Sequence, residues 1–169
     1  MPFLIDATVL SNLAAVGRLD VLNLLRAPLY LASAVYDEIQ QGLEEGYDFL
    51  SGVDKSLDSG LFSLTTLDSE DEWRHYRAMP DKLHRGEAMS LAIACHRRWH
   101  FLTDDRAARI HAMRLGVSCS GTLSLLRYAV QKGYLTVEEG NMLLAGMIKR
   151  ARFRSPVSDL RTLLEEDQE

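Results

Sequence analysis

The sequence predicts an α/β fold with a mostly parallel, five-stranded sheet that helices cover on both faces. One pattern in the sequence leads to this prediction. Short apolar runs, too short for helices, alternate along the chain with longer segments of helical periodicity. Such alternation is typical of strand-helix-strand units, in which the strands run parallel. The expected strands lie at residues 3–5, 28–31, 61–64, 99–103 and 117–119.

Helices are expected between these strands and in the C-terminal part of the chain. Thr8 and Ser33 are candidate caps of the helices that follow the first two strands, because a hydroxyl there can accept from free backbone amides. Residues 44–58 favour either a helix or an irregular excursion. The other helices are expected at about residues 9–16, 19–25, 33–43, 68–77, 84–95, 106–115, 123–132, 136–150 and 156–166.

The length of 169 residues suits a single domain, with a core over about residues 1–132 and C-terminal helices over about residues 136–166. No apolar run approaches the ~20 residues that cross a bilayer. No basic segment precedes an apolar stretch at the amino terminus, so a signal peptide is not expected. Cys95 and Cys119 lack the spacing of a metal site. They are expected to be buried thiols in a reducing cytoplasm.

Charge is distributed unevenly along the chain. The net charge of −5 and the pI near 5.5 argue against a generic basic nucleic-acid binder. Residues 35–72 hold eleven acids and one base, whereas residues 73–154 hold fifteen bases and six acids. A basic surface beside an acidic one would explain this pattern, and so would ordinary solvated helix faces. The basic region ends in a cluster made of Lys149, Arg150, Arg152 and Arg154.

Acidic residues stand where the predicted strands end and where helices begin. In a parallel sheet these positions share the carboxyl edge, where ligands bind. Carboxylates crowded there either have raised pKa values or are neutralised by a cation. For Glu38 and Glu87 there is a competing explanation, since an acid in the first helical turn also interacts favourably with the helix dipole. The candidate acids are Asp6, Glu38, Glu87, Asp104 and Asp105.

A site built from carboxylate oxygens suits Mg²⁺ or Mn²⁺, which serve phosphate chemistry. Such an ion can polarise a phosphoryl oxygen and activate a water molecule. Two hydroxyl residues, Thr8 and Thr103, lie close in sequence to the acids and could orient a ligand or a water.

Five stretches of the chain, taken in order, resemble the PIN-domain family, the fold of the VapC-type toxin ribonucleases. The resemblance extends from Phe3 to about Leu126, and the helical remainder is similar to the tail of one prokaryotic branch of that family. The matching stretches are Phe3–Leu10, Ala34–Ile39, His84–Ala92, Leu102–Arg109 and Leu115–Leu123.

This resemblance implies a PIN-like three-layer α/β/α fold and a Mg²⁺- or Mn²⁺-dependent endoribonuclease in which a metal-activated water cleaves RNA. Asp6, Glu38 and Glu87 match the first three acids of the family. The fourth falls on Asp105 or Asp104, and the spacing from the preceding threonine favours Asp105. The family's direct metal ligands would then be Asp6 and Asp105, with Glu87 and Glu38 binding directly or through water and Asp104 kept beside them.

Further expectations follow from the same resemblance. Thr8 matches the small hydroxyl position near the metal, and the third acid is Glu87 where the toxins often have Asp. The chain would be a homodimer acting on RNA, plausible as the toxin of a toxin-antitoxin pair with a small antitoxin partner. Three bases near the acids are candidates for contacts with RNA phosphates, although plain surface charge is the preferred explanation for each one taken alone: Arg85, Arg106 and Arg109.

Two other functions compete with the nuclease. A PIN fold that has lost catalysis would serve as a binding module for RNA or protein, yet the full set of acids argues against such a loss. A phosphatase or phosphoacceptor domain also has Asp after its first strand. Here Ala7 and Thr8 follow Asp6, and no second acid stands two residues on.

Overall fold

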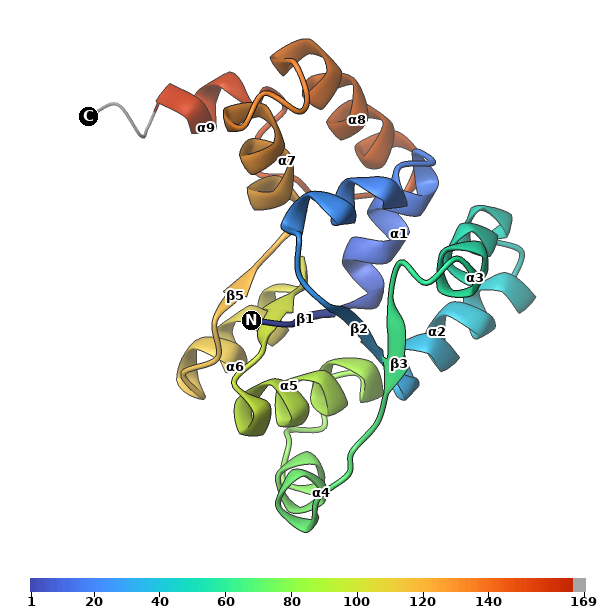
Figure 1. The fold of residues 1–169 in the computed structure, drawn as a ribbon, viewed down its shortest axis with the longest axis vertical. Coiled ribbons are helices and arrows are strands. Elements are labelled where there is room, and N and C mark those ends of the chain that lie inside the picture. Colours follow the sequence, from blue (N-terminus) through green and yellow to red (C-terminus); the bar gives the residue numbers. More distant parts are fainter. Residues whose placement is uncertain (166–169) are drawn as a thin grey trace.

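A computed structural model describes residues 1–165 and has a five-stranded parallel sheet at its centre (Figure 1). The strand order is β3-β2-β1-β4-β5, and all four pairings are parallel. The prediction of a mostly parallel five-stranded sheet is therefore confirmed. The strands are β1 (Phe3–Ile5), β2 (Leu29–Ala32), β3 (Ser63–Thr65), β4 (His100–Leu102) and β5 (Cys119–Ser120).

Helices surround this sheet. They are α1 (Ala7–Ala15), α2 (Ser33–Glu44), α3 (Ser51–Asp58), α4 (Glu70–Arg77), α5 (Arg85–Arg97), α6 (Arg106–Arg114), α7 (Thr122–Gln131), α8 (Val137–Arg150) and α9 (Arg161–Glu165). The 3₁₀ helices η1 (Leu19–Leu25) and η2 (Asp48–Leu50) complete the connections. Helix α5 contacts β1, β2 and β4 on one face of the sheet, and the other face meets η1 and α7. The result is the three-layer α/β/α arrangement.

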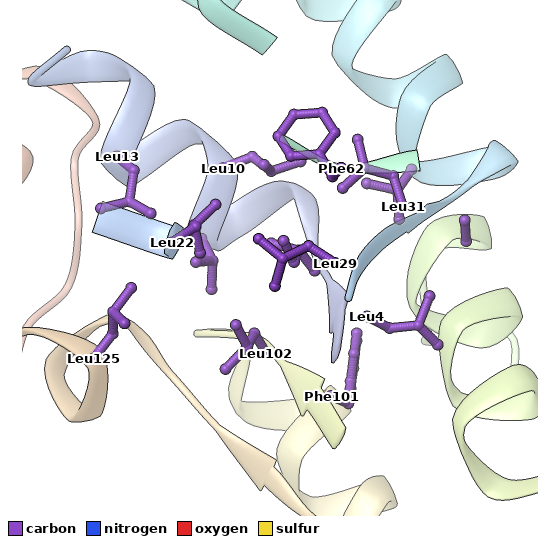
Figure 2. Close-up of a cluster of buried hydrophobic side chains, with 14 of the residues drawn as sticks. Leu4, Leu10, Leu13, Leu22, Leu29, Leu31, Phe62, Phe101, Leu102 and Leu125 are labelled. Carbon is purple, nitrogen blue, oxygen red and sulfur yellow. The ribbon is translucent and has the colours of Figure 1, made fainter. Parts of the chain in front are cut away.

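Side chains of the three inner strands, β1, β2 and β4, are mostly buried on both faces of the sheet, which explains why these strands are continuous apolar runs. The edge strands β3 and β5 are less buried. Leu4 and Phe101 are in register and fully buried, and they lie on the α5 side in Figure 2. Complete burial of one such side chain contributes about 1.5–3 kcal/mol. Figure 2 also shows where side chains of α1, η1 and α7 meet those of the strands: Leu10, Leu13, Leu22, Leu125, Leu29 and Leu102.

The register of the two central strands positions the carboxyl edge of the sheet. Ile5 of β1 lies opposite Leu102 of β4, so these strands end at the same level. The backbone amide of Asp6 donates to the carbonyl oxygen of Leu102 at 2.8 Å, which extends the pairing by one step. Residues that follow β1 and β4 therefore emerge side by side.

The C-terminal helices return to the start of the chain. Helix α8 packs against both α7 and α1. At the end of α8, the Arg150 guanidinium donates to the carbonyl oxygen of Ala15 at 3.5 Å, at the end of α1. Residues 151–154, which follow this contact, line a cavity with Ala7 and Thr8 at the opposite end of α1, next to the carboxyl edge of β1. Among the described residues, no helix combines the length and apolar character needed for a membrane crossing.

Several predicted boundaries were wrong. Helix α1 begins at Ala7 with Asp6 at the N-cap, so Thr8 lies inside the helix and does not cap it. Ser33 is the first residue of α2 and the N-cap is Ala32. The last strand is at 119–120 rather than 117–119. For residues 44–58 the sequence predicted either a helix or an irregular excursion. In the structure α2 continues to residue 44, and η2 and α3 follow it.

The last helix also starts later than predicted, at residue 161 rather than 156, and the predicted end at residue 166 lies outside the described residues. Asn141 of α8 explains the delay, because its side chain accepts from the Leu160 amide and donates to Asp159, both at 2.8 Å. These bonds hold the residues just before α9 in a non-helical conformation. The two cysteines, predicted to be buried, are half-buried free thiols.

Candidate active site

Asp6 is the most deeply buried acid of the carboxyl edge, with 1% of its surface exposed. Its Oδ2 accepts hydrogen bonds from the hydroxyls of Thr8 and Thr103, each at 2.7 Å. These hydroxyls come from the first turn of α1 and from the end of β4. Burial raises the pKa of Asp6, and the two threonine hydrogen bonds partly offset that rise by stabilising the charged form.

The N-terminus of α5 holds two further carboxylates. The backbone amide of Gly86 donates to Oε1 of Glu38 at 2.8 Å. A side chain at Gly86 would place its Cβ 2.8 Å from that same oxygen, so only glycine permits α2 to approach this closely. Glu87, the third residue of α5, turns back and accepts from the His84 amide at 3.0 Å, which forms a capping box.

Glu87 shows most clearly that these acids affect one another. Its pKa is raised from 4.5 to about 8, first by burial and then by the negative charges of Asp6, Asp105 and Glu38. Burial and the charge of Asp6 also raise the pKa of Glu38. Within residues 1–165, no ion pair with a basic side chain relieves this repulsion.

Asp105 and Asp104 are adjacent in sequence, but their side chains have different partners. Asp105 is the N-cap of α6, where its Oδ1 accepts from the Ala108 amide at 2.8 Å. Its own amide donates to the Thr103 hydroxyl at 3.1 Å, and its charge acts on Glu87. Asp105 therefore belongs to the same group of acids as Asp6, Glu38 and Glu87. We call these four residues the carboxylate cluster.

Asp104 instead links the end of β4 to the helices α1 and α7. Its Oδ2 accepts from the Asn12 side chain of α1 at 2.8 Å and also from the Thr122 hydroxyl. Its Oδ1 accepts from the Thr122 amide, at the start of α7, at 2.7 Å. A Cβ at Gly121 would collide with Asp104 Oδ1, so glycine is needed for this close contact. Both oxygens of Asp104 thus accept structural hydrogen bonds, three in all, which fill most of the roughly four acceptor sites of a carboxylate.

Asn12, Gly121 and Thr122 were not identified from the sequence. A buried asparagine on the otherwise apolar face of α1 was the available signal, because a buried amide needs a polar partner. That signal does not identify the partner, which lies far along the chain.

The donor set suits a hard divalent cation. It consists of carboxylates that raise one another's pKa values, and Mg²⁺ and Mn²⁺ prefer oxygen ligands. Within the described part of the chain, no three His, Cys, Asp or Glu side chains are arranged to hold an ion in their present conformations. Glu38 and Glu87 are each turned onto a backbone amide through one oxygen, which leaves the second oxygen of each for a ligand.

The three predicted arginines differ in their surroundings. Arg106 opens α6 and lines two cavities, of about 680 and 700 Å³, that also share Asp104. Arg109 lines the first of them, and Asp105 and Thr8 line the second. Arg85 is exposed at the start of α5, where its charge acts on Glu38.

The fold and the site together define an α/β protein with a carboxylate cluster at the carboxyl edge of its sheet. A family model described as a PIN domain matches residues 2–169, and the chain belongs to the PIN-domain family. A search of curated proteins found no match to the chain. PIN domains are typically nucleases and generally use divalent metal ions, which indicates a nuclease-type function.

Proposed function

We propose that the protein is a Mg²⁺- or Mn²⁺-dependent endoribonuclease that hydrolyses RNA phosphodiester bonds. The observation that carries this proposal is the mutual repulsion of Asp6, Glu38, Glu87 and Asp105 at one edge of the sheet. Carboxylates are brought together without cationic partners at a cost in stability, and a bound divalent cation removes that cost. Membership of a family of nucleases supports the same conclusion.

In this proposal Asp6, Glu87 and Asp105 hold the ion, and Glu38 binds it directly or through water. Asp104 was also predicted as a metal ligand, beside Asp105. We assign it a structural role instead, because its oxygens accept hydrogen bonds from Asn12 and Thr122. The ion, when bound, polarises the scissile phosphate and activates the attacking water.

The other residues of the site orient these acids. The hydroxyls of Thr8 and Thr103 fix the carboxylate of Asp6 in one direction. The Gly86 amide holds Glu38 towards the start of α5. Glu87, with its pKa near 8, carries a proton at neutral pH in the metal-free protein and releases it when a cation binds.

The test is cleavage of a mixed single-stranded RNA pool by the purified protein, with Mn²⁺ and with chelator. The Asp6→Asn variant is compared with Asp20→Asn, which changes an exposed acid of η1. We expect cleavage by the wild type and by Asp20→Asn, only with metal, and none by Asp6→Asn. Cleavage by folded Asp6→Asn protein would contradict the assignment.

Two outcomes would favour the competing functions. Mn²⁺ binding without cleavage of RNA would support the binding-module function, and hydrolysis of a small phosphate ester would support a phosphatase. The finer roles implied by the family resemblance, a toxin with a small antitoxin and a cytoplasmic homodimer, belong to this proposal. Growth arrest on expression, relieved by the product of a neighbouring reading frame, would support the toxin role.

A further inference from the structure

The segment between α8 and α9 borders the candidate active site. Residues 151–154, Ala-Arg-Phe-Arg, line the cavity of about 700 Å³ together with Thr8 and Asp105. We call these residues the C-terminal wall. They come from the far end of the chain, yet they share a cavity with residues that follow β1 and β4.

The C-terminal wall is anchored to the fold. The amides of Ala151 and Phe153 donate to the Met147 carbonyl of α8, at 2.9 and 3.3 Å. Phe153 is half-buried and packs against the hydrophobic core. Arg150, just before the wall, contacts α1 through Ala15. The wall is therefore held in place beside the cavity.

Three cationic side chains face this cavity. Arg152 and Arg154 of the wall are both exposed, as is Arg106 at the start of α6. Among the described residues, none of the three forms an ion pair. Unpaired guanidinium groups beside a carboxylate cluster suit a ligand that has several phosphates, since each group can bind a phosphate oxygen.

The backbone at Arg152 is left-handed, with a φ of +56°. A side chain disfavours this region by roughly 1–2 kcal/mol. Two other arginines, Arg26 and Arg98, adopt the same conformation at the ends of η1 and α5. The left-handed backbone is thus not particular to Arg152, whose relevance to the site comes from its place in the lining of the cavity.

We propose that the C-terminal wall forms one side of the substrate channel, where Arg152 and Arg154 bind the phosphates of single-stranded RNA next to the cleaved bond. The proposal rests on the nuclease function of the carboxylate cluster. The adjoining cavity, which shares Arg106 and is lined by Arg109, continues the path of the strand. Such contacts position the strand without reading its sequence.

The test measures binding without cleavage. The probe is a short, mixed-sequence, fluorescein-labelled single-stranded RNA, whose anisotropy is followed over a KCl series in chelator. All proteins carry Asp6→Asn. The wall variant is Arg152→Gly with Arg154→Ala. Its matched control is Lys149→Ala with Arg114→Ala, which removes two exposed charges outside both cavities.

We expect the wall variant to bind roughly tenfold or more weakly than the Asp6→Asn parent. The slope of log affinity against log salt should fall by about 1.4, because each lost single-strand phosphate contact removes about 0.7. The control should change the slope little. Glycine at residue 152 relieves the left-handed strain, so the variant should keep its melting temperature.

Equal binding and equal salt slopes in the wall variant and its control would overturn the proposal, as would a parent that does not bind this RNA. The outcome is separable from the nuclease function. If RNA binding depends on the two arginines but the wild type never cleaves RNA, only the proposed nuclease function is refuted. Cleavage by the wild type with a wall variant that binds like the control would refute only this inference.

Discussion

The hydroxyl of Thr103 donates a 2.7 Å hydrogen bond to Oδ2 of Asp6, and so joins the ends of the two central strands at the base of the candidate site. The same hydroxyl accepts from the Asp105 amide at 3.1 Å. Thr103 is fully buried, so water cannot replace either bond. One side chain therefore orients two of the proposed metal ligands.

Thr103→Val should reduce both stability and metal affinity. It leaves buried polar groups without partners, which costs about 1–3 kcal/mol of the free energy of unfolding. Loss of a group that orients a ligand typically weakens metal binding by about 10–100-fold. Thr122→Val is the matched control, because Thr122 is equally buried but bonds to Asp104. Denaturant unfolding and Mn²⁺ titration should show a similar stability loss in both variants and weakened Mn²⁺ binding in Thr103→Val alone. Equal Mn²⁺ affinities would contradict the proposed arrangement.

Asparagine at Asp104 and at Asp105 should have opposite effects. Asp104→Asn places an amide group where the Asn12 amide and the Thr122 hydroxyl now donate, and should cost about 1–3 kcal/mol of stability. The folded fraction should still cleave RNA. Asp105→Asn should unfold near the wild-type midpoint but lose metal-dependent cleavage. Chemical denaturation and the RNA assay, run on both variants, check this pair. Activity in Asp105→Asn together with its loss in folded Asp104→Asn would reverse the assignment.

Gly86→Ala should destabilise the protein although alanine favours helices. The added Cβ would meet Oε1 of Glu38 at 2.8 Å and Cγ2 of Val35 at 2.9 Å. In an open helical position the same change stabilises by up to about 1 kcal/mol. Gly52→Ala in α3 provides that comparison, because its Cβ would meet only an ordinary contact at 3.4 Å. Thermal unfolding should show a lower midpoint for Gly86→Ala and an equal or higher one for Gly52→Ala. A rise at both positions would show that α2 and α5 can separate without loss.

The metal-free protein should become less stable as pH rises from about 6.5 to 8. The pKa of Glu87 in the folded protein is raised from 4.5 to about 8, so in this range the folded state binds more protons than the unfolded state. Stability therefore falls with rising pH, and the raised pKa values of Asp6 and Glu38 act in the same direction. Below this range the lowered pKa values of three histidines, His75, His100 and His111, act in the opposite direction. Melting temperatures in chelator at a series of pH values should show the decline, and Glu87→Gln should flatten it. Excess Mn²⁺ at pH 8 should restore the midpoint, and a flat profile for the wild type would refute the raised pKa.

The positions of Asp6 and Asp105 could be predicted because each follows an apolar strand almost directly, and parallel strands end at one edge. The choice between Asp104 and Asp105 could not be settled from the local sequence. It depends on Asn12, which lies 92 residues from Asp104 and reaches it only after α1 has packed beside β4.

The position of the C-terminal wall beside the site could not be predicted from the sequence, for a related reason. The basic cluster that ends at Arg154 is visible in the sequence, but its place beside Asp105 depends on α8 packing against α1. The early start predicted for the last helix had a similar cause. Asn141 bonds to residues 159 and 160, and no local pattern reveals such a distant contact.

Strand β1 lies in the middle of the sheet although it precedes the other strands of that sheet along the chain. Its partner β4 begins at residue 100, and Asp105 follows after that. Pairing over such a separation forms slowly, because the entropy of closing a long loop must first be overcome. A growing chain thus carries Asp6 and Glu38 well before it carries Asp105. Assembly of the complete carboxylate cluster therefore waits until β4 and Asp105 have been synthesised, and shorter nascent chains cannot contain it.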